Sequence, residues 1–210
     1  MSVSTEPSPT ARFHHDLRAA VARRFREING DHPMTPADDR YVDFEYASLE
    51  ELAAGHGLDP DAVRADMLSY RLPLPSYLRS DGTEMFHRDL FGLADQLGLD
   101  NLRSWFVRQF ADPVTGREEW QAYLSGQYVC LHSVTPWTIQ RKGELVGAIQ
   151  DAVADPQPRS TAWLDQLHDW VDQLDVLAPA YTGYDVLRFG GPTGRQTNID
   201  AIRAKFPRRR

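Results

Sequence analysis

Residues 120–144, WQAYLSGQYVCLHSVTPWTIQRKGE, lie between two segments with helical patterning and hold the only cysteine of the chain, Cys130. A histidine, His132, follows two residues later. Ser133 or Thr135 is a suitable cap for the next helix, because small hydroxyl side chains accept hydrogen bonds from the free N–H groups of a first helical turn. The rest of the chain is therefore expected to be organised around this segment, and a functional site is expected within it.

The bulk properties of the chain exclude several classes of protein. Its 210 residues carry a net charge of −7, so the whole molecule is not drawn to nucleic acid or anionic lipid. One cysteine excludes an intramolecular disulfide and a multi-cysteine zinc site. No apolar run reaches the roughly 18 residues of a membrane span, and the N-terminus lacks the apolar core of a signal peptide. A cytoplasmic protein is expected.

The N-terminal 46 residues predict one helix and one loop. Residues 1–9 are polar and are expected to fray. Apolar side chains at helical spacing then run from Phe13 to Ile28, and Gly30 is placed to end that helix. Residues 31–46 are interpreted as a loop with a short extended piece near its end. Residues 1–46 are therefore assigned to an N-terminal helix and loop.

Residues 47–92 give the clearest order of elements. Ser48 with Glu51 forms a capping box, and Asp59 caps a second helix. The pair Asp81-Gly82 favours a two-residue hairpin turn. The runs LEELAAGHGLDPDAVR and LPLPSYLRSDGTEMFHRDL thus resemble the MerR and excisionase type of winged helix-turn-helix. That resemblance implies a winged-helix-like module, assigned to residues 47–98, and DNA as its ligand.

The charge of this module opposes DNA binding. Affinity for DNA comes largely from Lys and Arg side chains that neutralise phosphates. Residues 47–92 hold four arginines against eight acids, and Asp59 and Asp61 stand at the start of the second helix, where base contacts would be made. DNA is therefore not the expected partner, and a structural or protein-binding module is the favoured interpretation.

The remainder, residues 99–210, predicts a helical domain. Asp100 is expected to cap a helix with an aromatic stripe, and Pro136 to begin another that extends to about residue 153. An amphipathic helix follows and ends before Pro179, and Thr197 is expected to cap the last helix. The predicted fold class is mainly α: a winged-helix-like module with a small β-hairpin, followed by a helical bundle.

Cys130 and His132 are the candidate catalytic residues. In an extended segment, side chains two residues apart point to the same face, so a thiol and an acid–base group would lie within reach of each other. The alternative for Cys130 is a small buried hydrophobe within an apolar run. Both interpretations stay open.

Cations and aromatic residues on either side suggest a binding site for an anion. Free N–H groups at the start of the helix after Pro136 attract anions, and Arg141 and Lys142 lie in its second turn. Arg188 and Arg195 flank a glycine-rich loop that lacks any nucleotide-binding spacing. The alternatives are a solvated surface helix and a loop that only packs. Tyr128 and Trp137 are the expected walls, and no metal ligand or cofactor motif is identified.

Two runs carry a further resemblance: LSGQYVCLHSVTPWTIQRKGELVGAI and YDVLRFGGPTGRQTNIDAIRAKFP. They resemble an actinobacterial family of natural-product biosynthesis proteins, a domain of unknown function. The resemblance implies a biosynthetic gene-cluster context and gives no reaction.

The sequence therefore supports three alternative hypotheses about function. The first is a protein of specialised metabolism that binds or converts a small anionic molecule. The second is a MerR-like DNA-binding regulator. The third is a non-catalytic scaffold, acting as a homodimer or with a biosynthetic partner protein.

Overall fold

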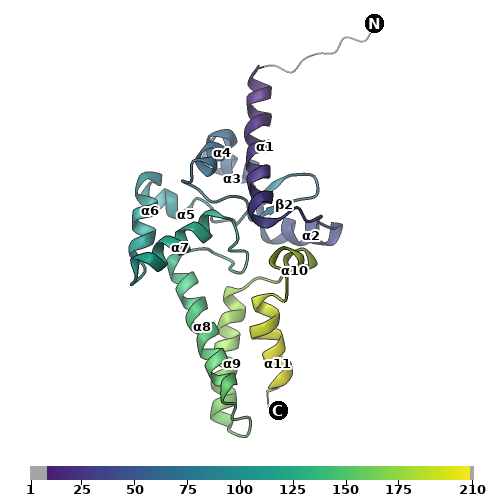
Figure 1. The fold of residues 1–210 in the computed structure, drawn as a ribbon, viewed down its shortest axis with the longest axis vertical. Coiled ribbons are helices and arrows are strands. Elements are labelled where there is room, and N and C mark those ends of the chain that lie inside the picture. The colour runs from purple at the N-terminus through teal and green to yellow at the C-terminus, as the bar shows by residue number, and fades with distance from the viewer. Residues whose placement is uncertain (1–8, 209–210) are drawn as a thin grey trace.

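The structure is a computed structural model that describes residues 9–208, so the segment predicted to fray lies, except for its last residue, outside the described residues. The described chain is mainly helical, with eleven α-helices and one small three-stranded antiparallel sheet. Figure 1 shows an elongated molecule in which α1 projects at one end and α8, α9 and α11 run together at the other. The mainly α prediction is confirmed.

Two helices precede the sheet. Helix α1 (Pro9–Asn29) ends at Gly30, whose φ of 78° confirms the predicted helix stop. The interpretation of residues 31–46 as a loop is wrong, because α2 (Pro36–Glu45) occupies most of it. Thr35 and Asp38 form a complete capping box at its start, which stabilises a short helix despite its many polar residues.

The next segment holds the two predicted helices and the predicted hairpin, and a short strand before the first helix, which was not predicted, adds a third strand to the sheet. The Ser48–Glu51 capping box and the Asp59 cap are both confirmed. Strand β3 lies between β1 and β2, in the register Ala47↔Phe86 and Tyr77↔Met85. The elements are β1 (Ala47–Ser48), α3 (Leu49–His56), α4 (Pro60–Leu68), β2 (Tyr77–Leu78) and β3 (Glu84–Phe86).

The hairpin loop between β2 and β3 is longer than predicted. Arg79 N donates to Thr83 O at 3.0 Å, so three residues close the loop and the two-residue turn is wrong. Gly82 still supplies the positive φ, 79°, that such a loop needs.

Helices α5 (Gly92–Leu97), α6 (Leu99–Arg108) and α7 (Pro113–Leu124) follow. The cap predicted at Asp100 is wrong: α6 begins one residue earlier, after Gly98, and has no side-chain cap. The aromatic stripe is core, as predicted. Phe106 stacks on Tyr123 and lies edge-on to Trp120, with ring centroids 5.3 Å apart in both pairs.

The last helices form the bundle. They are α8 (Pro136–Ala154), α9 (Thr161–Leu177), α10 (Gly183–Phe189), the π-helical turn η1 (Gln196–Asp200) and α11 (Ala201–Lys205). Thr135 caps α8 through a capping box with Thr138, as the sequence predicts. The cap predicted at Thr197 is wrong, because Thr193 exchanges the capping hydrogen bonds with Gln196 and the helical turn begins earlier.

Four groups of buried apolar side chains hold these elements together. One joins α8 and α9 to η1 and α11. Another gathers Val42 of α2, Tyr77 of β2, Val129 and Tyr184 of α10. The sheet therefore packs against both the N-terminal and the C-terminal parts of the chain, and the loop of residues 125–135 lies at their junction.

Candidate functional site

A cavity of about 350 Å³, here named the Lys142 cavity, lies where the predicted site was expected. It opens between residues 128–130, α8, α9 and η1. Four of the eight predicted site residues line it: Tyr128, Cys130, Lys142 and Arg195. The structure thus brings together residues that are as far as 67 positions apart.

Lys142 is the central charge of this cavity. Its ammonium Nζ lies 2.6 Å from Cys130 Sγ, and the side chain is half-buried. Within residues 9–208, no carboxylate lies at ion-pairing distance from Nζ. Glu119 also lines the cavity, and burial raises the pKa of its carboxyl while Lys142 acts in the opposite direction. A half-buried ammonium without a carboxylate partner is a ready site for an anion.

Arg195 lies across the cavity but is already held by the protein. Its guanidinium donates to Ala178 O at 3.0 Å and pairs with Asp175 at 2.5 Å. Asp175 also pairs with Arg203 at 2.9 Å. The two arginines share the carboxylate of Asp175, so positive charge remains at this wall of the cavity. The same contacts fix the orientation of the Arg195 side chain.

The expected Cys130–His132 pair is not assembled. The prediction of an extended segment is wrong, because Leu131 N donates to Tyr128 O and residues 128–131 form a turn. His132 Nδ1 lies 3.6 Å from Glu45 instead, on an exposed side chain that does not line the cavity. Cys130 therefore has an amine, and not an imidazole, as its neighbour.

Three other predicted residues also lie away from the cavity. Trp137 is 66% exposed, and Arg141 contacts Glu144 of α8 and Gln173 of α9 and does not line the cavity. Arg188 is buried and donates to Asn29 Oδ1 at 2.9 Å, to Ser76 O at 2.8 Å and to Gly126 O at 3.3 Å. Burial lowers the pKa of its guanidinium. These contacts favour a structural role for Arg188.

Besides Glu119, two further polar side chains that line the cavity, Tyr181 and Asn198, were not identified as site residues from the sequence. Tyr181 lies against Cys130, and burial followed by that cysteine raises the pKa of its phenol. Asn198 of η1 is buried and donates to Gly194 O at 3.0 Å. Tyr181 lies in an irregular segment and Asn198 in the π-helical turn η1, and in neither place does residue spacing indicate a tertiary contact.

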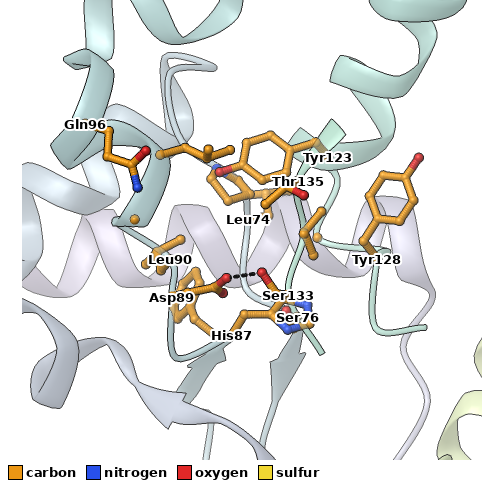
Figure 2. Close-up of a pocket in the computed structure, with 16 residues that line it drawn as sticks. Leu74, Ser76, His87, Asp89, Leu90, Gln96, Tyr123, Tyr128, Ser133 and Thr135 are labelled. Atoms are coloured by element: carbon orange, nitrogen blue, oxygen red, sulfur yellow. Dashed lines mark hydrogen bonds between the residues drawn. The ribbon is translucent and has the colours of Figure 1, made fainter. Parts of the chain in front are cut away.

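A second cavity, of about 270 Å³ and here named the Asp89 cavity, lies between the sheet, α5 and the start of α8. Figure 2 shows its polar side chains: Asp89 and Ser133 joined by a hydrogen bond, His87 beside them, and Tyr123 and Gln96 at the far side. Tyr128 lines both cavities. The sequence predictions did not include this site.

Comparison with known proteins assigns the chain to a family. A model for a family of unknown function, DUF6058, matches residues 96–207, more than half of the chain, and the protein belongs to that family. Every residue lining the Lys142 cavity lies inside the matched segment, whereas the Asp89 cavity also draws on residues before it. No curated protein and no solved structure matches the chain.

No helix among residues 9–208 is long and apolar enough to cross a membrane. Over the same part of the chain, no group of three or more His, Cys, Asp or Glu side chains is placed to hold a metal ion.

Proposed function

We propose that this protein binds a small anionic molecule in the Lys142 cavity, as a cytoplasmic protein of natural-product biosynthesis. The observation that supports this most directly is the Lys142 ammonium, half-buried at the cavity wall with a sulfur atom beside it and no described carboxylate at ion-pairing distance. A desolvated cation attracts a carboxylate or phosphate oxygen more strongly than an exposed one does.

The walls suggest which anions fit. Ile139, Val146, Leu174 and Ile199 line the cavity with apolar surface, and the rings of Tyr128 and Tyr181 add to it. About 350 Å³ is at the small end of ligand sites. A monocarboxylate with a short apolar or aromatic body is therefore the favoured ligand class.

Conversion of the ligand would involve Cys130. Cysteine attacks electrophiles as the thiolate, and a neighbouring cation favours that form. Lys142 supplies the cation at 2.6 Å. In this proposal a convertible ligand is an α,β-unsaturated carboxylate: Lys142 holds the carboxylate, the Cys130 sulfur bonds to the β-carbon as the C=C π bond breaks, and the α-carbon takes up the proton that the thiol lost. His132 has no part in this chemistry.

The alternatives receive less support from the geometry. The order and pairing of β1, α3, α4, β2 and β3 favour a winged-helix-like module. Arg64 of α4, the helix that would read DNA, is buried in ion pairs with Glu50, Asp61 and Glu84. Those contacts remove it from any DNA interface, so the module is proposed to act in packing or in binding a partner protein.

A calorimetric titration tests the proposal. The purified chain would be titrated with benzoate, phenylacetate, 3-methylbutanoate and inorganic phosphate, alongside Lys142→Gln and Arg141→Gln. Arg141 is the matched control, because it is the adjacent cation on α8 and points away from the cavity. We expect at least one carboxylate to bind, with affinity lost in Lys142→Gln and kept in Arg141→Gln.

Two results would overturn it. Equal affinity of the ligand for Lys142→Gln and for the unchanged chain would show that the Lys142 ammonium does not bind the ligand. Absence of binding across the panel, together with a salt-sensitive gel shift on DNA, would favour the regulator.

A further inference from the structure

We propose that the Asp89 cavity is a second ligand site, specific for a small apolar ammonium compound. It is separate from the proposed anion site and does not depend on it.

The charges of the cavity favour a cation. Asp89 supplies a carboxylate, and the Ser133 hydroxyl donates to its Oδ2 and fixes its direction. No Lys or Arg is among the described residues that line this cavity. The Lys142 cavity has the opposite charges, with Lys142 and Arg195 at its walls. The two sites would therefore select ligands of opposite sign.

His87 does not cancel this negative charge. Burial lowers the pKa of its imidazole to about 4, although Asp89 and a hydrogen bond with the His132 backbone act to raise it. The ring is therefore neutral at pH 7. Its Nε2 atom is buried and has no hydrogen-bond partner within the described part of the chain. An N–H group of a ligand would donate a hydrogen bond to His87 Nε2, which no described group of the protein does.

The walls select an apolar body. Leu74, Phe86, Leu90 and Val134 line the cavity, and the ring of Tyr123 closes its far side near Gln96 (Figure 2). The volume, about 270 Å³, limits the ligand to one aromatic ring or a short branched chain. A primary amine on such a body would place its charge at Asp89 and its apolar part against these walls.

Isosteric probes separate charge from shape. The chain would be titrated with 2-phenylethylamine, 2-phenylethanol and phenylacetate, which share a ring and differ in the terminal group. The amine is expected to bind in the Asp89 cavity about two- to fivefold more tightly than the alcohol, since an ion pair with the exposed Asp89 carboxylate adds to the same apolar contact.

Variants then locate the binding. Asp89→Asn is expected to abolish the preference for amine over alcohol, and Leu93→Trp, which fills the cavity, to weaken both ligands. Asp151→Asn, an exposed acid on α8, is the charge-matched control and should bind as the unchanged chain does. Circular dichroism would verify that each variant is folded.

Three outcomes would overturn the proposal: equal affinity for amine and alcohol, an amine preference that survives Asp89→Asn, or no binding of the amine. Amine binding that disappears in Lys142→Gln but not in Asp89→Asn would also contradict it, and would assign the amine to the other cavity.

Discussion

The Tyr77 hydroxyl donates a hydrogen bond to Asp185 Oδ1 across 3.0 Å, and both residues are fully buried. Tyr77 lies on β2 and Asp185 on α10, 108 positions apart. Asp185 also accepts from Thr182 at the start of α10. This contact therefore joins the sheet to the helix that leads into the C-terminal bundle.

Tyr77→Phe should destabilise the fold by about 1.5–3 kcal/mol, because a buried carboxylate loses a donor that water cannot replace. Tyr70→Phe is the matched control, since Tyr70 is half exposed and its ring keeps its contact with Arg24. Urea unfolding followed by circular dichroism measures both. Equal midpoints for the two variants would show that the Tyr77–Asp185 bond adds no stability.

Arg64→Met should cost about 3–5 kcal/mol, since it leaves Glu84, which is fully buried, without its counter-ion. Arg71→Met removes an exposed arginine that pairs with Asp66 and Asp100, and should cost less than about 1 kcal/mol. Thermal unfolding of both variants compares them directly. A small loss in Arg64→Met would contradict the structural assignment of this arginine.

The free energy of unfolding should fall as the pH drops from about 6.5 toward about 4. Over this range the imidazole of His87 binds a proton in the unfolded chain but stays neutral in the folded chain, so protonation favours unfolding. Above pH 6.5 the residue is neutral in both states and contributes nothing to the pH dependence. The difference in unfolding free energy between the unchanged chain and His87→Gln isolates this histidine, and should decrease by on the order of 2 kcal/mol over that range. A difference that stays flat would show that His87 titrates normally in the folded state.

Lys142→Met should slow alkylation of Cys130 by iodoacetamide several-fold, because it removes the ammonium that lies 2.6 Å from the reacting sulfur. Cys130 is the only cysteine, so intact-mass measurement follows it without ambiguity. Arg141→Met should react at the original rate. An unchanged alkylation rate in Lys142→Met would show that Lys142 does not affect the reactivity of Cys130.

The sequence predicts those features of the fold that depend on residues close together in the chain, such as the caps and ends of helices. The capping box at Ser48 and the helix stop at Gly30 involve partners within four positions, and both are confirmed; of the two candidate caps Ser133 and Thr135, Thr135 is the one that caps α8. Helix α2 was missed although Thr35, Pro36 and Asp38 carry the same signal, because the segment lacks a continuous apolar stripe. A strong cap therefore outweighs weak apolar periodicity in a short helix.

The candidate site could be predicted as a region but not as a set of contacts. Lys142 reaches Cys130 because residues 128–131 form a turn, and the choice between turn and strand is made by packing against other parts of the chain. Arg188 was predicted either to bind an anion beside the glycine-rich loop or to belong to a loop that only packs, and in the structure two backbone carbonyls and an asparagine bind it in the interior. Tertiary partners of this kind leave no periodic trace in the sequence.

The central claim, that an anion binds beside Lys142, is tested most directly by the protection of Cys130. The alkylation rate would be measured at increasing concentrations of the carboxylate that binds most tightly. The account predicts that the rate falls along a saturation curve whose midpoint equals the calorimetric dissociation constant, and that Lys142→Gln shows no protection. A rate that stays constant at saturating carboxylate would place the ligand elsewhere and contradict the proposed site.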